Sequence, residues 1–105
     1  MSTEKKRQDG EGVDLKDRQK IEPPNKYKVV LHNDDYTPMD FVIVILMDAF
    51  NFSFQKAAAI TMQVHEQGKG IAGAYSKEIA FMKVKKCNKI ARAEGHPLKV
   101  TMEVE

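Results

Sequence analysis

The first 24 residues limit what this chain can fold into, because they carry many charges and little that can be buried. Acidic and basic side chains fill the segment, and its only sizeable aliphatic residues are Val13, Leu15 and Ile21. Burial of so few apolar groups cannot offset the conformational entropy lost on ordering. We therefore predict a disordered N-terminal arm over residues 1–24 and a folded core over residues 25–105.

The folded part is large enough for one hydrophobic core and too small for two. The 17 basic and 15 acidic residues of the chain leave a net charge of +2, which gives no reason to expect bulk attraction to nucleic acid or to an anionic membrane. The longest apolar run, residues 41–47, falls far short of the roughly 20 residues of a membrane span. We expect a soluble monomer that binds no membrane.

Three segments have the composition or the periodicity of strands. Residues 27–32 are rich in β-branched and aromatic side chains, and residues 98–104 alternate between apolar and polar side chains. Residues 70–75 form a shorter apolar segment, in which two glycines predict a close approach of another backbone.

Three further segments have the apolar period and the capping residues of helices. Thr37 is predicted to cap a helix over residues 38–50, and Ser53 a second over residues 54–67 that Gly68 ends. Ser76 is predicted to cap the third. The predicted buried stripe of the second helix is Phe54, Ala57, Ala58, Thr61 and Val64. The order β-α-α-β-α-β predicts an α+β fold, a two-layer sandwich of three strands and three helices with at least one antiparallel pairing.

Residues 32–39 concentrate donors and acceptors at the junction between the first strand and the first helix. Turn formation alone would account for Asn33 and Asp34, because their side chains bond to nearby backbone groups. His65, near the end of the second helix, would by itself interact favourably with the helix dipole. The residue types alone leave these structural roles open beside a functional one.

Other functions have weaker support in the sequence. A hydrolase would need an activated nucleophile, but Cys87 falls on the apolar stripe of the third helix, and as a single cysteine it predicts a reducing, cytoplasmic location. A metal site from His32, Asp34, Asp35 and His65 matches no standard spacing. The lysines of the third helix lack the interleaved aromatic residues of a nucleic-acid surface. We therefore expect no catalysis, metal or cofactor, and keep a metal- or nucleic-acid-binding module as the alternative function.

Three sequence motifs resemble those of the ClpS family, the bacterial adaptors of the ClpAP protease. They are Lys-Val-Val-Leu-His-Asn-Asp-Asp-Tyr-Thr-Pro-Met over residues 28–39, Val-His-Glu-Gln-Gly over residues 64–68 and Gly-His-Pro-Leu over residues 95–98. The resemblance covers essentially the whole predicted core. It implies an adaptor that binds proteins whose first residue is Leu, Phe, Tyr or Trp, the substrates of the bacterial N-end rule, and delivers them to the ClpA unfoldase.

The resemblance implies that Asn33, Asp34 and His65 hold the α-amino group of the substrate. This group has a pKa of about 7.7 to 8.0 and is mostly an ammonium with three donors at neutral pH. An amide oxygen, a carboxylate and a neutral imidazole nitrogen would supply three acceptors. Bonds of this kind are roughly twice as strong as neutral ones.

The resemblance also implies an apolar pocket for the first side chain and a contact with the N-terminal domain of ClpA. The implied pocket residues are Leu31, Asp35, Thr37, Pro38, Met39, Val42, Thr61, Val64 and Leu98. Met39 corresponds to the gatekeeper that disfavours Ile and Val, and the implied contacts with the unfoldase are Tyr36, Glu78 and Lys83. His32 and Thr61 depart from the family pattern, in which both positions are usually apolar and the second is often Met.

Overall fold

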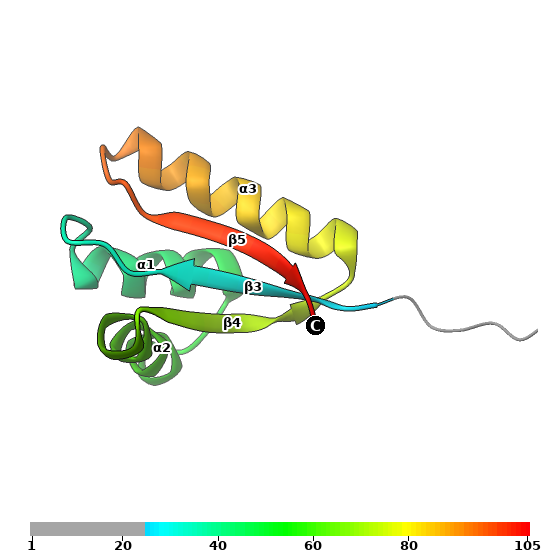
Figure 1. The fold of residues 1–105 in the computed structure, drawn as a ribbon. Coiled ribbons are helices and arrows are strands. Elements are labelled where there is room, and N and C mark those ends of the chain that lie inside the picture. Colours follow the sequence, from blue (N-terminus) through cyan, green and yellow to red (C-terminus); the bar gives the residue numbers. More distant parts are fainter. Residues whose placement is uncertain (1–24) are drawn as a thin grey trace, which may run out of the picture.

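The three strands and three helices follow one another in the predicted order β-α-α-β-α-β, so the predicted α+β fold is confirmed (Figure 1). The structure is a computed structural model that describes residues 25–105. The predicted arm, residues 1–24, lies outside the described residues. The elements are β3 (Tyr27–His32), α1 (Met39–Phe50), α2 (Phe54–Gln67), β4 (Lys69–Tyr75), α3 (Lys77–Ala93) and β5 (Lys99–Val104).

The sheet has the order β4-β3-β5, and β3 pairs with both neighbours in antiparallel orientation. In this register, His32 at the end of β3 lies between Lys69, which begins β4, and Lys99, which begins β5. The loop that follows β3 and the segments that precede the other two strands therefore meet at one end of the sheet. Residues far apart in the sequence come together there.

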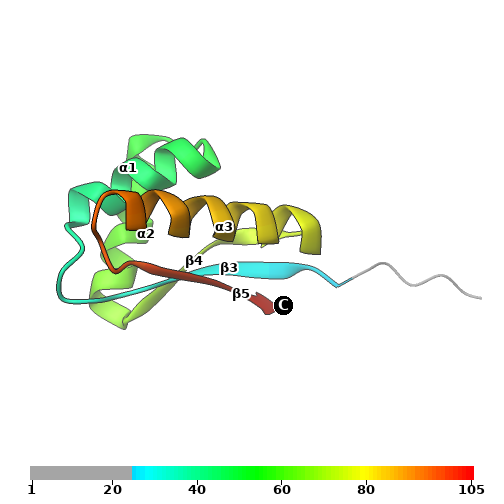
Figure 2. The ribbon, with the colours of Figure 1, turned by 90° about the horizontal axis from the view of Figure 1, so that it is seen from above.

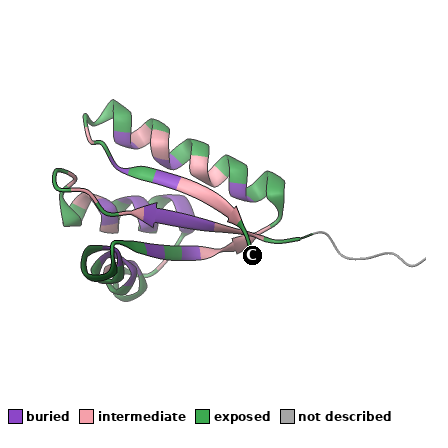
Figure 3. Cartoon of the chain, in the orientation of Figure 1, coloured by how far each residue is buried: buried purple, intermediate pink, exposed green. Residues whose placement is uncertain are grey.

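The helices bury one face of the sheet. Figures 1 and 2 show α1 and α3 on the same side of the sheet, while α2 packs along the edge formed by β4. The core includes Leu31 from β3, Leu46 from α1 and Cys87 from α3, all almost inaccessible to solvent (Figure 3). Leu98, just before the last strand, and Val100, near its start, are buried, whereas burial decreases toward the end of β5.

Helix α1 begins one residue later than predicted, and Thr37 does not cap it. Pro38 occupies the N-cap position in an extended conformation and provides no side-chain hydrogen bond. The hydroxyl of Thr37 is instead a donor to the carboxylate of Asp34, so it is turned back toward the preceding loop. The two other predicted caps are confirmed: Ser53 accepts from the N–H of Lys56, and Ser76 accepts from the N–H of Ile79.

The buried stripe of α2 also differs from the prediction. It runs through Ala57, Ile60, Thr61 and Val64, whereas Phe54 is 59% exposed. The reason is the position of β4, whose Gly70 lies against the turn that contains Ile60 and Val64. Phe54 stands more than a full turn before that contact.

Replacing Gly70 with alanine is expected to destabilise the fold. A Cβ atom at this position would lie 2.8 Å from Cγ2 of Val64, closer than the roughly 3.5 to 4.0 Å of a normal carbon contact. The backbone of Ile60 lies close behind, and overpacking of this kind costs roughly 1 to 3 kcal/mol of unfolding free energy. Urea denaturation measures the change, with exposed Lys69→Ala in the same strand as the control. Equal midpoints for the two variants would contradict this account of the packing.

Candidate functional site

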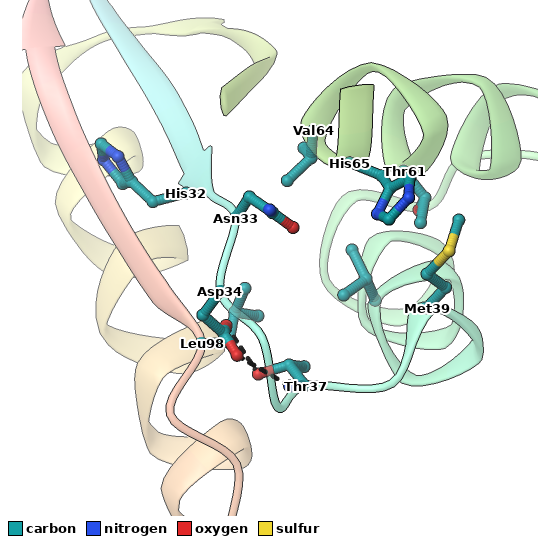
Figure 4. Close-up of a pocket in the computed structure, with 10 residues that line it drawn as sticks. His32, Asn33, Asp34, Thr37, Met39, Thr61, Val64, His65 and Leu98 are labelled. Atoms are coloured by element: carbon teal, nitrogen blue, oxygen red, sulfur yellow. Dashed lines mark hydrogen bonds between the residues drawn. The ribbon is translucent and has the colours of Figure 1, made fainter. Parts of the chain in front are cut away.

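The loop after β3 is folded around the carboxylate of Asp34. Its Oδ1 accepts hydrogen bonds from the backbone N–H groups of Tyr36, at 2.8 Å, and Thr37, at 2.7 Å. Its Oδ2 accepts a third from the hydroxyl of Thr37, at 2.8 Å (Figure 4). Asp34 therefore sets the shape of the loop, and its negative charge stays at the mouth of the site.

The pKa of Asp34 is lowered from its ordinary value of 3.8. Partial burial is the largest influence and on its own would raise the pKa. The hydrogen bonds from Thr37 and Tyr36, with a smaller contribution from the nearby His96, outweigh it. The carboxylate is consequently ionised throughout the neutral range.

A backbone hydrogen bond joins this loop to the end of α2. The N–H of Asn33 donates to the carbonyl of Gly68 at 2.9 Å. Gly68 ends α2 with a φ of 88°, a conformation that glycine adopts without strain, and its N–H bonds to the carbonyl of Val64. This clasp brings the side chain of Asn33 toward that of His65 in the last turn of α2 (Figure 4).

Asn33 and His65 keep their hydrogen-bonding groups available for a ligand. In residues 25–105, the structure contains no side-chain hydrogen bond from the Asn33 amide or the His65 imidazole, and both residues are exposed. His65 also lies at the helix end where the backbone carbonyls place partial negative charge. The Asn33 amide, the His65 imidazole and the Asp34 carboxylate thus line one cavity at the C-terminal end of α2, an arrangement suited to a small cation.

Next to these groups lies a small cavity that opens to solvent and has a solvent-accessible volume of about 20 Å³. It is lined by His32, Asn33, Asp34, Thr37, Met39, Val42, Thr61, Val64, His65 and Leu98. The structure therefore brings the three predicted amino-group ligands together with six of the predicted pocket residues. Except for the ring of His65 and the hydroxyl group of Thr61, the cavity wall contributed by α1, α2 and the segment before β5 is apolar.

Three predicted pocket residues do not line this cavity. Leu31 is fully buried in the core, and Asp35 is exposed on the loop. Pro38 instead lines a separate surface cavity with Phe41 and His96.

His32 lines the cavity although the sequence analysis did not assign it to the pocket. Figure 4 shows its imidazole directed away from Thr61 and His65. Its Nε2 is hydrogen-bonded to Oγ1 of Thr101 on β5 at 2.8 Å. The adjacency of His32 to Asn33 was the only signal in the sequence that His32 lies near the site. Nothing in the sequence indicated its hydrogen bond to Thr101.

Leu98 is placed at the cavity by a clamp from α3. One nitrogen of Arg92, Nη1, donates to the carbonyl of His96 at 2.9 Å and to that of Leu98 at 2.7 Å. These bonds fix the turn between α3 and β5. The side chain of Leu98 is 1% exposed and closes one side of the cavity.

The three residues predicted to contact the unfoldase do not form one patch. Tyr36 is 79% exposed on the loop after β3, whereas Glu78 and Lys83 lie in the first half of α3. Figures 1 and 2 both place that loop and the start of α3 at opposite ends of the sheet.

The Lys83 ammonium has intramolecular partners. It donates to the carbonyl of Ala49 in the last turn of α1 at 3.0 Å and lies 5.1 Å from the ring centre of Phe50. Helix α1 has no basic residue of its own in that turn, so Lys83 supplies the favourable charge at its C-terminus.

Cys87 has the properties of an inert core residue. Burial raises the pKa of its thiol to about 11, although the charges of Lys83 and Lys86 act in the opposite direction. Because the thiolate is the reactive form, we expect folded protein at pH 8 to react with a thiol reagent at least about a hundredfold more slowly than urea-unfolded protein. Absorbance of the released chromophore measures the rate, and rapid labelling of the folded protein would contradict the assignment.

The candidate metal ligands are not assembled into a metal site. Across residues 25–105, no three side chains of His, Cys, Asp or Glu gather closely enough to hold an ion. In the same part of the chain, no helix combines the length and the apolar character needed to cross a bilayer.

Comparison with known proteins identifies the family. The family model described as ATP-dependent Clp protease adaptor protein ClpS matches residues 22–101. The chain belongs to the ClpS family. It is thus an adaptor of the ATP-dependent Clp protease, and the resemblance noted in the sequence is confirmed.

Curated ClpS proteins are similar over most of their length. The ClpS protein of Desulforapulum autotrophicum is 52% identical over 82 residues, which cover 78% of this chain and 79% of the relative. That of Vibrio atlanticus is 51% identical over 94 residues, covering 88% and 89% respectively. Among solved structures, Agrobacterium tumefaciens ClpS2 bound to L-phenylalaninamide superimposes with a TM-score of 0.78 at 36% identity, covering 79% of this chain and all of that one.

Proposed function

We propose that this ClpS adaptor captures proteins by a free N-terminal residue with a bulky apolar side chain, namely Leu, Phe, Tyr or Trp. The observation that carries the proposal is the pair of unengaged acceptors, Asn33 and His65, beside the Asp34 carboxylate at the edge of an apolar cavity. An α-ammonium has three donors and one positive charge, which this arrangement complements. L-phenylalaninamide, the ligand of Agrobacterium ClpS2, has the same two groups, a free amine and an apolar ring.

The three amino-group ligands differ in their tasks. Asn33 offers its amide oxygen and His65 its unprotonated ring nitrogen. Asp34 already accepts three hydrogen bonds from its own loop, so it contributes chiefly negative charge and one remaining lone pair. A ligand without the positive charge would leave these groups desolvated and unpaired.

The first side chain enters the cavity between α1, α2 and the segment before β5. We propose as its walls the lining residues Thr37, Met39, Val42, Thr61, Val64 and Leu98. Burial of a Leu or Phe side chain there contributes roughly 1.5 to 3 kcal/mol. Met39 is 38% exposed at the first turn of α1, a position from which it disfavours residues branched at Cβ.

We further propose that the captured protein is delivered to the N-terminal domain of ClpA, in the cytoplasm, by a monomeric adaptor that catalyses no reaction and needs no cofactor. Glu78 and Lys83 on α3 are the proposed contacts with the unfoldase. Tyr36, at the other end of the sheet, would require a second point of contact. For the alternative of a metal-binding module, residues 25–105 contain no cluster of side chains that could hold an ion.

Replacing His65 with alanine tests the amino-group site. We expect the affinity for a labelled peptide with Phe as its first residue to fall about tenfold to a hundredfold, the usual effect of losing a hydrogen bond to a charged group. Fluorescence anisotropy measures the dissociation constant. Gln55→Ala, an exposed change at the opposite end of the same helix, is the matched control. Equal affinity of the His65 variant and the control would remove the basis of the proposal.

A further inference from the structure

Thr61 is the one buried polar side chain in the described part of the chain, residues 25–105, and it lines the proposed pocket. It is 3% exposed and shares the cavity wall with the apolar side chains of Val42, Val64 and Leu98. Buried polar groups are expensive unless their hydrogen-bonding capacity is used. The role of this hydroxyl therefore bears on which side chains the pocket accepts.

The single O–H donor of Thr61 is already used in a hydrogen bond within α2. Oγ1 of Thr61 donates to the carbonyl of Ala57, one turn earlier in α2, at 2.8 Å. A hydroxyl has one hydrogen to donate and two lone pairs with which to accept. What remains available at Thr61 is acceptor capacity alone, so its natural complement is a ligand group that donates.

The position of Thr61 along α2 gives the depth of this acceptor. Thr61 precedes His65 by four residues, which corresponds to about 6 Å along the helix axis and to the same helix face. Figure 4 shows the two side chains next to each other on one wall of the cavity. A first residue whose amino group is held at His65 and whose side chain extends along this wall brings the far end of an aromatic ring toward Thr61.

We propose that Thr61 makes this adaptor prefer tyrosine over phenylalanine as the first residue of its substrates, by accepting a hydrogen bond from the phenol O–H. The inference rests on the proposed function, because it places the ligand in the same pocket. A tyrosine hydroxyl buried among apolar groups without a partner loses its hydrogen bonds to water, whereas here Thr61 replaces one of them. Phenylalanine offers nothing to the lone pairs of Thr61.

Thr61→Val separates this hydrogen bond from the shape of the wall. Valine retains the branched outline of threonine and removes only the hydroxyl, while the carbonyl of Ala57 keeps its place in the helix. Anisotropy with two peptides that differ only in Tyr or Phe at the first position gives the ratio of dissociation constants. We expect unmodified protein to bind the Tyr peptide about three- to tenfold more tightly than the Phe peptide, the usual effect of one hydrogen bond.

In the Thr61→Val variant, the ratio of the two dissociation constants is expected to fall to about one, because the hydroxyl that favours Tyr over Phe is gone. Thr61→Ser, which keeps the hydroxyl, should retain the preference. The same ratio in unmodified protein and in Thr61→Val would overturn the inference, as would tighter binding of Phe by the unmodified protein. If none of these free peptides binds, the proposed function itself fails; if all bind with an unchanged ratio, only the role of Thr61 is lost.

Discussion

Acetylation of the α-amino group of a peptide with Phe as its first residue is expected to weaken its binding by at least about a hundredfold. Acetylation removes the positive charge and two of the three donors that Asn33, Asp34 and His65 are proposed to bind. It also adds bulk where the clasp between Asn33 and Gly68 confines the site. Loss of one hydrogen bond to a charged group costs roughly 1.5 to 3 kcal/mol, and acetylation removes more than one.

Fluorescence anisotropy with the free and the acetylated form of one labelled peptide measures this effect. A peptide with the same composition but with Phe moved to the third position is the control for nonspecific burial of the ring. Delivery can be followed in parallel as loss of fluorescence from a Phe-led reporter protein in the presence of ClpAP and the adaptor. Similar affinity for the acetylated and the free peptide would contradict the proposed function. The cavity would then recognise the apolar side chain and not the free N-terminus.

Removal of the Asp34 carboxylate is expected to have the second large effect, and two substitutions separate its two tasks. Asp34→Asn retains an oxygen that can accept from the N–H groups of Tyr36 and Thr37, but it removes the charge. Asp34→Ala removes both. We expect both variants to bind Phe-led peptides at least about a hundredfold more weakly, because an ammonium then lacks its counter-charge.

The two variants are expected to differ in stability. Asp34→Ala leaves two backbone N–H groups and the hydroxyl of Thr37 without their acceptor, which costs roughly 1 to 2 kcal/mol of unfolding free energy. Asp34→Asn should lose less. Urea denaturation compares them, and Thr37→Val, which removes only the hydroxyl's bond, is the control. Normal peptide binding by Asp34→Asn would exclude a role for the charge.

The stabilising effect of Asp34 should depend on pH in a defined direction. Its pKa is lowered in the folded protein, so the carboxylate favours the folded state above the ordinary pKa of 3.8. That contribution disappears as the pH falls through the still lower pKa of the folded state. The difference in stability between unmodified protein and Asp34→Asn is therefore expected to be constant near neutrality and to shrink below about pH 4.

The periodic elements of this fold could be predicted from sequence, because burial of one helix face or one strand face leaves a repeating pattern. The predicted cap at Thr37 was wrong for a local reason: α1 begins at Met39 with Pro38 as its N-cap, so Thr37 lies one residue too early, and its hydroxyl donates to Asp34. The predicted burial of Phe54 was wrong for a long-range reason, since the close approach of Gly70 selects the turn of α2 that is covered.

The residues of the candidate site could be grouped from the family motifs, whereas periodicity did not group them. Periodicity alone left Asn33 and His65 as a turn residue and a helix-end residue, and the family motifs connected them. Local sequence contains no signal for the contacts that place the surrounding groups, such as the clamp from Arg92 to Leu98 or the bond from Lys83 to Ala49. Long flexible cations reach partners across the fold, and their targets are backbone carbonyls, which every residue possesses.

The clasp between the N–H of Asn33 and the carbonyl of Gly68 has a consequence for quality control of the adaptor itself. The two halves of the proposed amino-group site come from distant parts of the sequence and meet only when β3 and α2 are both in place. A partly unfolded copy therefore lacks any grip on a chain end. Under the proposed function, such a copy would release a bound substrate instead of retaining it.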